Sequence, residues 1–196
     1  IQCGYLYMDP LARLFGSYAR LKLLRLFVFN DDMSFTIPDI VERTKTPKDA
    51  VRKEVSALVT CGLIRKRAGK GGVQYVANRK FQYFDALQSF IRSTTNLSDT
   101  DIVTSFKRAG AIRLVVLTGL FTGALETKVD LLIVGDKLED KQLESSVRAL
   151  EADLGRELRF ASFSTEDFAY RRGVYDRLLR DIFDFPHRVI FDRLGL

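Results

Sequence analysis

The sequence has one histidine, no tryptophan and only two cysteines. Cys3 and Cys61 lie far apart and form no CxxC motif, so a reducing cytoplasm is the expected setting. Because His187 is the single histidine, no histidine-based metal cluster can form, and a serine–histidine–acid triad would have to use it. It lies in a Phe-Pro-His turn, where we expect a structural role. We expect neither a metal nor another cofactor.

Long hydrophobic runs are also absent. No apolar stretch approaches the roughly 20 residues of a membrane-spanning helix, and the start, IQCGYLYMDP, lacks the features of a signal peptide. The hydrophobic fraction is 46% and the charged fraction is 29%, as in ordinary globular proteins. A length of 196 residues fits one large or two small domains. We therefore expect a cytoplasmic protein with no membrane partner.

The charge is distributed unequally along the chain. Residues 1–96 hold 16 lysines and arginines against 8 aspartates and glutamates, a balance of +8. Residues 97–196 hold 15 against 17, a balance of −2. This asymmetry indicates that the first half binds a polyanion, although a solvated basic surface would have the same composition.

Two helix-start patterns follow each other in the first half. Thr36-Ile37-Pro38-Asp39 and Thr46-Pro47-Lys48-Asp49 each place a threonine N-cap three residues before an aspartate. They predict helices over about 37–45 and 47–60, joined by a tight turn at Thr46. Gly62 fits the left-handed position after the second helix.

A hairpin follows these helices. The stretch LIRKRAGKGGVQYVAN, residues 63–78, predicts two strands around a glycine-rich tip. An earlier helix begins after Ser17, and an amphipathic helix is expected over 81–94. The order of helix, helix–turn–helix and hairpin is that of a winged helix-turn-helix.

The helix over 47–60 has the features of a DNA-recognition helix. Val51, Val55 and Leu58 mark its buried side, so its short polar and cationic side chains project outward, where they can reach base edges in a major groove. The cations beside the hairpin tip can approach phosphates or the minor groove. The predicted DNA-binding residues are Lys48, Asp49, Arg52, Lys53, Ser56, Arg65, Lys66, Arg67 and Lys70.

Residues 11–78 resemble the winged-helix domains of the arsenical-resistance repressor type. The resemblance is carried by LFGSYARLKLLRLF, TPKDAVRKEVSALVTCGLI and RKRAGKGGVQY. It implies a dimeric transcriptional regulator that binds double-stranded DNA. Some members of that family sense metals through paired cysteines on the recognition helix. Cys61 stands alone at the helix end, so DNA binding is expected and metal sensing is not.

Residues 99–196 resemble the nucleotidyltransferase fold, through TGLFTGALETKVDLLIVGD and the later LGRELRFASFSTEDF. Members of that family hold a triphosphate with a Gly-Ser turn and bind two divalent metals with three acids. Here Leu120 replaces the serine and Lys128 replaces the first acid, while Asp130 matches the second. The strand around Arg159 supplies no third carboxylate. One acid cannot hold two metal ions, so we interpret Asp130 as a vestigial metal position.

Asp130 is expected to form an exposed ion pair with Lys128, worth about 0–1 kcal/mol. We therefore expect no enzymatic activity and no catalytic residue. Two alternatives remain: a nucleotidyltransferase that uses a nucleoside triphosphate and Mg²⁺, and a toxin–antitoxin type module that binds a protein partner through the second domain.

The sequence thus predicts an α+β protein with two domains. Residues 1–8 are expected to be an N-terminal extension, and residues 9–95 a winged helix-turn-helix DNA-binding domain with an appended helix. Residues 96–196 are expected to form a small, catalytically degenerate nucleotidyltransferase-like α/β domain with a mixed sheet, which serves assembly or regulation. The expected partners are double-stranded DNA and a second copy of the chain, with a further protein partner for the C-terminal domain.

Overall fold

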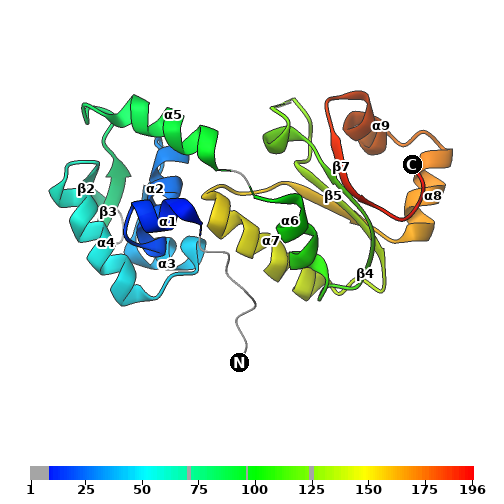
Figure 1. Ribbon diagram of the computed structural model, residues 1–196, viewed down its shortest axis with the longest axis horizontal. Coiled ribbons are helices and arrows are strands. Elements are labelled where there is room, and N and C mark those ends of the chain that lie inside the picture. The colour runs from blue at the N-terminus through cyan, green and yellow to red at the C-terminus, as the bar shows by residue number, and fades with distance from the viewer. Residues whose placement is uncertain (1–8, 70–71, 96, 124–125) are drawn as a thin grey trace. The chain divides into compact units, whose positions relative to one another are not determined.

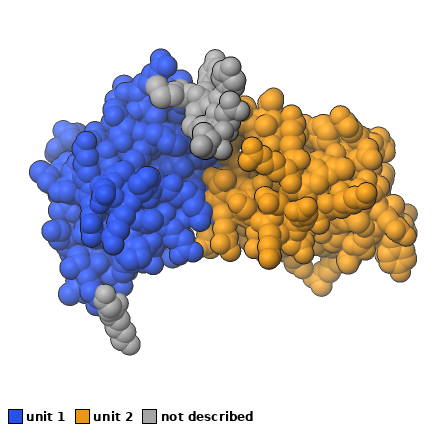
Figure 2. Space-filling view, turned by 90° about the horizontal axis from the view of Figure 1, so that it is seen from below, with its two compact units in different colours: residues 1–96, 151–156 blue, residues 97–150, 157–196 orange. Residues whose placement is uncertain are grey.

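Figure 1 presents the computed structural model of the chain, which describes residues 9–69, 72–95, 97–123 and 126–196. Its contacts divide it into two units (Figure 2). The first unit takes residues up to 96 together with 151–156, and the second takes 97–150 and 157–196. Helices and strands are both abundant, so the chain belongs to the α+β class.

The first unit is a helical body with a small sheet. Its elements, in chain order, are α1 (Pro10–Leu14), α2 (Tyr18–Phe29), β1 (Ser34–Phe35), α3 (Ile37–Thr44), α4 (Lys48–Thr60), β2 (Ile64–Gly69), β3 (Gly72–Ala77) and α5 (Phe84–Thr94). The sheet is antiparallel with the order β1-β3-β2, which leaves β2 at an edge. The predicted helices and hairpin are confirmed, although α5 begins three residues later than expected.

Three of the predicted helix ends are confirmed by their hydrogen bonds. The Ser17 hydroxyl accepts from the Arg20 amide at 3.2 Å, and Thr36 forms a capping box with Asp39. After α4, the Gly62 and Leu63 amides donate to the carbonyls of Val59 and Leu58. This Schellman pattern requires the left-handed backbone of Gly62, whose φ is +83°.

The predicted threonine cap of α4 is wrong. Pro47 is the N-cap residue, and no side chain caps the helix. The buried Thr46 hydroxyl instead donates to the Thr44 carbonyl at 3.2 Å. Thr46 therefore fixes the turn between α3 and α4 rather than the first amides of α4.

Helix α2 is the centre of the first unit, because every residue from Leu21 to Val28 is buried. Its apolar side chains pack on α3, α4 and the sheet, and Phe27 meets Phe35 edge to face with centroids 5.7 Å apart. The predicted buried side of α4 is confirmed, since Val51, Val55 and Leu58 all belong to this core.

Two cations of α2 are also buried, and acidic partners from distant parts of the chain meet them. Arg25 donates to the Asp9 carboxylate at 2.7 Å and to the Asp153 carbonyl at 2.9 Å. Lys22 lies 3.0 Å from the Asp153 carboxylate, which also accepts from the Tyr18 hydroxyl at 2.7 Å. Because a buried charge without a partner is costly, these bonds make residues 151–156 part of the first unit.

The second unit is built on a four-stranded sheet. Its elements, in chain order, are α6 (Asp99–Phe106), β4 (Ala111–Leu117), the 3₁₀ turn η1 (Gly119–Phe121), β5 (Leu131–Asp136), α7 (Asp140–Leu154), β6 (Phe160–Phe163), α8 (Thr165–Gly173), α9 (Arg177–Asp184) and β7 (Arg188–Asp192). The last turn of α7 falls in the first unit. The sheet order is β6-β5-β4-β7, with β5 and β6 parallel and the other pairs antiparallel, so the predicted mixed sheet is confirmed.

The central strands of this sheet are apolar on both faces. Residues 114–117 of β4 and 131–134 of β5 are fully buried, which explains their continuous runs of Val, Leu and Ile. Strand β6 begins at Phe160, so Arg159 lies directly before it. In the described part of the chain, no helix has the length and apolar character needed to cross a membrane.

Candidate nucleic-acid interface

The outer side of α4 carries mainly polar and charged side chains. Lys48, Asp49, Arg52, Lys53 and Ser56 are all exposed, while the residues between them face the core. The helical period accounts for this division, since the exposed and buried positions alternate every three to four residues. The structure therefore brings all five predicted α4 residues to one accessible side.

A partly buried ion pair sets the position of α4. Glu54 is 4% exposed and faces α2, where its carboxylate accepts from the Arg20 guanidinium at 2.8 Å. Arg20 also donates to the Phe15 carbonyl at 3.0 Å, which fixes the guanidinium in turn. A charge-assisted bond of this kind restricts sliding and rotation of α4 on α2. Sequence reasoning did not identify Glu54, although its position beside Val51 and Val55 on the inner side was a signal.

The one acidic residue of the outer face has a cationic neighbour. Asp49 and Arg52 lie one turn apart, with 3.7 Å between carboxylate and guanidinium. Both side chains are largely exposed, so the pair is weak. Arg52 can therefore exchange Asp49 for another acceptor at small cost.

The hairpin cations divide between two faces of the sheet. Arg65, Lys66 and Arg67 are exposed on β2 and pair in register with Val76, Tyr75 and Gln74 of β3. Because successive strand residues point to opposite faces, Arg65 and Arg67 share one face and Lys66 lies on the other. The sequence grouped the three together, and the structure separates them. Lys70 lies outside the described residues.

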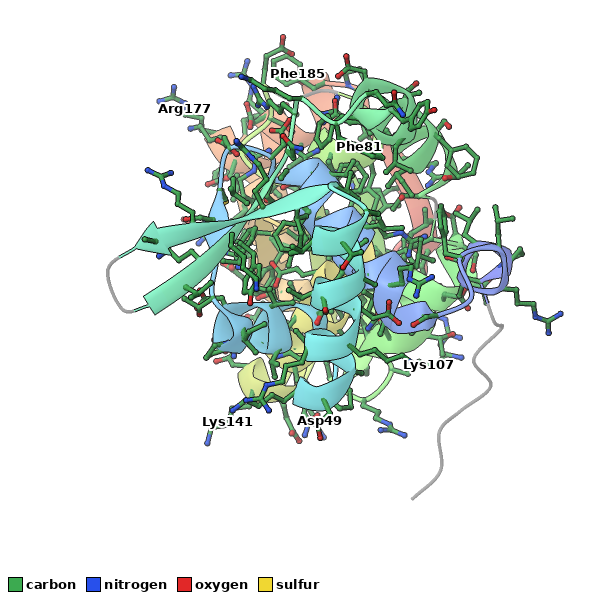
Figure 3. All side chains as sticks on the ribbon, turned by 90° about the vertical axis from the view of Figure 1, so that its left-hand side faces the viewer. Asp49, Phe81, Lys107, Lys141, Arg177 and Phe185 are labelled. Atoms are coloured by element: carbon green, nitrogen blue, oxygen red, sulfur yellow. The ribbon has the colours of Figure 1, made fainter. Side chains whose placement is uncertain are left out.

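Helix α4 and the hairpin lie on the same side of the first unit. They are at the left in Figure 1, and they are the elements nearest the viewer in Figure 3, where Asp49 marks the start of α4. Lys45, in the turn before α4, is a further exposed cation that sequence reasoning missed. Its left-handed backbone, with φ of +50°, directs the chain from α3 into α4. The position of Lys45 between the two predicted helices could have identified it from the sequence.

In the second unit, Asp130 is buried at the start of β5, with 4% of its surface exposed. Its carboxylate accepts from the Arg159 guanidinium at 2.9 and 3.0 Å, from the Arg159 amide at 3.0 Å and from the Leu120 amide at 2.8 Å. Burial would raise the pKa of Asp130, but the bonds from Arg159 and Leu120 outweigh it and lower that pKa below its usual value.

The predicted Asp130–Lys128 ion pair is therefore wrong. The partner of Asp130 is Arg159, which the sequence analysis had considered only as a position without a carboxylate. Lys128 is exposed, and its backbone amide donates to Asp181 at 2.9 Å. The error came from treating two residues close in sequence as partners. The structure places both before β5, where strand alternation does not put their side chains on one face.

Asp130 also dictates the turn that follows β4. Gly119 has a φ of +51°, and a Cβ at this position would meet the Asp130 carboxylate, the Thr127 hydroxyl and the Val129 carbonyl. Only glycine fits this close approach and this backbone.

Among the described residues, no three carboxylate, cysteine or histidine side chains gather as a metal site. His187 is exposed and bonds through Nδ1 to the Phe185 carbonyl at 2.9 Å.

Comparison with protein-family models, with curated proteins and with solved structures gave no match for this chain.

Proposed function

We propose that this chain is a sequence-specific transcriptional regulator that binds double-stranded DNA through α4 and the β2–β3 hairpin. The observation that carries the proposal is the exposure of three α4 cations and three hairpin cations on elements at the same side of the first unit. The order of helices and hairpin is that of a winged helix-turn-helix, with α4 as the recognition helix.

Each side chain has a role that follows from its chemistry. Arg52 and Lys53 can donate to guanine edges in the major groove, and Ser56 can contact several bases. Asp49 can accept from cytosine, and its weak pair with Arg52 leaves both groups available to bases. Lys48, Arg65, Lys66 and Arg67 are assigned to phosphates, which supply affinity without sequence preference. The partly buried Arg20–Glu54 pair keeps α4 at a fixed depth.

The second unit, in this proposal, is a nucleotidyltransferase-like domain that serves assembly or regulation and has no transferase activity. The support is the state of Asp130, whose two carboxylate oxygens already accept four hydrogen bonds. The Arg159 guanidinium beside Asp130 opposes the binding of a divalent cation there. We further propose a homodimer paired through α5, because Phe90 on that helix is 39% exposed beside Phe15.

The test is DNA binding at several salt concentrations, with fragments selected from genomic DNA. The Arg52→Ala, Lys53→Ala double variant is expected to bind its selected site at least tenfold more weakly. The matched control is Lys107→Ala, Arg108→Ala, which removes two adjacent exposed cations from the second unit. The control is expected to bind as the parent chain does.

Three results would contradict the proposal. These are affinity that does not change with salt, equal weakening by the control double variant, and failure to bind any duplex. Magnesium-dependent transfer from a nucleoside triphosphate, lost in Asp130→Ala, would support the enzymatic alternative. Copurification of a stoichiometric protein partner, without DNA binding, would support the protein-interaction alternative.

A further inference from the structure

The second unit contains a pocket of about 640 Å³ that the proposed function does not use. Its lining comes from the end of α8, the turn at Tyr175 and Asp176, α9, His187, Val189 of β7 and Leu196. Figure 1 shows α8, α9 and β7 as neighbours. Its volume falls within the range of small-molecule sites, roughly 300–1,000 Å³. Every residue that lines it belongs to the second unit.

The pocket has an apolar floor. Leu179 is buried in the core of the unit, Phe183 is packed against that core, and Val189 remains 40% exposed on β7. An exposed valine beside a buried leucine and an aromatic ring gives an apolar surface that water solvates poorly. The floor is therefore suited to the hydrocarbon body of a ligand.

Tyr175 stands at the rim as the left-handed residue that ends α8, with a φ of +56°. The Tyr175 and Asp176 amides donate to the Arg172 and Arg171 carbonyls, which is the Schellman pattern of a helix end. This helix end leaves Tyr175 81% exposed beside the pocket. The ring is available to cover a ligand that lies on Leu179 and Phe183.

The rim also offers a cation for an anionic group. In the part of the chain that the structure describes, no carboxylate lies within ion-pair distance of exposed Arg172, whereas neighbouring Arg171 bonds to Asp167 and Asp176. Two carboxylates also line the pocket, and each already has a guanidinium partner: Asp176 pairs with Arg171 at 3.3 Å and Asp184 with Arg180 at 3.6 Å. A guanidinium binds a carboxylate through two parallel bonds, which makes Arg172 the anchor that this pocket presents.

We propose that this pocket binds a small organic carboxylate with an aromatic body. The aromatic ring lies on Leu179, Phe183 and Val189, Tyr175 covers it, and the carboxylate pairs with Arg172. The proposal does not depend on DNA binding, and it assigns a site for a small-molecule effector to the second unit.

Phenylacetate is the probe, with acetate and phenethylamine as controls that lack the ring or carry the opposite charge. The readout is the change in amide chemical shifts of the full chain during titration. We expect saturable shifts at Gly173, Tyr175 and Val189 with phenylacetate, and at least tenfold weaker binding of both controls. In Arg172→Gln the affinity is expected to fall about tenfold, whereas Arg108→Gln, an exposed arginine outside the pocket, should leave it unchanged.

A second variant guards against misfolding as an explanation. Val189→Glu places a negative charge on a half-exposed position of the floor, and we expect it to abolish binding while the remaining amide shifts are retained. The proposal is overturned if phenylacetate causes no shift at these three amides, or if acetate or phenethylamine binds equally well. It is also overturned if these amides shift with protein concentration alone, because the pocket would then receive a second copy of the chain.

Discussion

Arg159 holds Asp130 through three hydrogen bonds, two from its guanidinium and one from its own backbone amide. The Leu120 amide adds a fourth, so this carboxylate connects β5, the start of β6 and the turn after β4. Asp130, which the nucleotidyltransferase resemblance marks as a vestigial metal position, therefore has a structural role.

Asp130→Ala is expected to destabilise the second unit by about 2 kcal/mol, because it leaves the Leu120 amide and the Arg159 guanidinium without their acceptor. This loss of unfolding free energy is smaller than for a fully buried ion pair, since the Arg159 side chain is 51% exposed. Urea unfolding measures the change. Glu144→Ala, which removes an exposed pair with Arg148, is the control and should cost under 0.5 kcal/mol. Equal effects of the two variants would contradict a structural role for Asp130.

The Asp130 pair also predicts a pH dependence. The pKa of Asp130 is lowered in the folded chain, and an unfolded aspartate has a pKa of about 3.9. Its stabilisation is therefore complete above about pH 5 and decreases as the pH falls through the unfolded value toward the folded pKa. Between pH 7 and pH 3, Asp130→Asn should lose less stability than the parent chain. Parallel loss in both chains, measured by thermal unfolding, would refute this assignment.

Substitutions at Gly62 and Gly119 allow the cost of backbone strain to be measured apart from the cost of a steric clash. Gly62 and Gly119 both have positive φ, but a Cβ at Gly62 would meet nothing within 4 Å, whereas a Cβ at Gly119 would collide with the Asp130 carboxylate. Gly62→Ala should cost about 1 kcal/mol from strain alone. Gly119→Ala should cost at least twice as much. Comparable losses in urea unfolding would show that the turn can relax around Asp130.

The Asp153 carboxylate is expected to stabilise α2 from a distant part of the sequence. It accepts from Tyr18 and pairs with Lys22, and burial together with its hydrogen bond raises the pKa of Tyr18. Asp153→Ala should destabilise the first unit by about 2 kcal/mol. Hydrogen exchange of the α2 amides from Leu21 to Val28 measures this loss. Unchanged protection of these amides would contradict the prediction.

Local signals predicted most of the secondary structure. Ser17, Thr36 and Gly62 act through bonds within a few residues, so their spacing alone identifies the ends of α2, α3 and α4. The alternation of Val51, Val55 and Leu58 likewise fixed the two sides of α4. Such signals are strong because helix period and capping do not depend on the rest of the fold.

The partners that span the chain could not be predicted. Asp130 meets Arg159 across 29 residues, and Tyr18 meets Asp153 across 135. No periodicity connects residues so far apart, and the pairing depends on strand order and helix placement. Lys128 was the plausible partner of Asp130 by sequence distance, which is why the prediction failed there. The faces of Arg65, Lys66 and Arg67 became distinct only once the register of β2 with β3 was known.

The inclusion of residues 151–156 in the first unit has a consequence for the order of synthesis. A ribosome adds about 5–20 residues per second, so about 3–12 s separate residue 95 from residue 156. During that interval Lys22, Arg25 and Tyr18 have emerged without Asp153. Strands β4 and β5 are made before the last contacts of α2 can form. The newborn chain therefore completes its N-terminal unit only after it has begun the unit that follows.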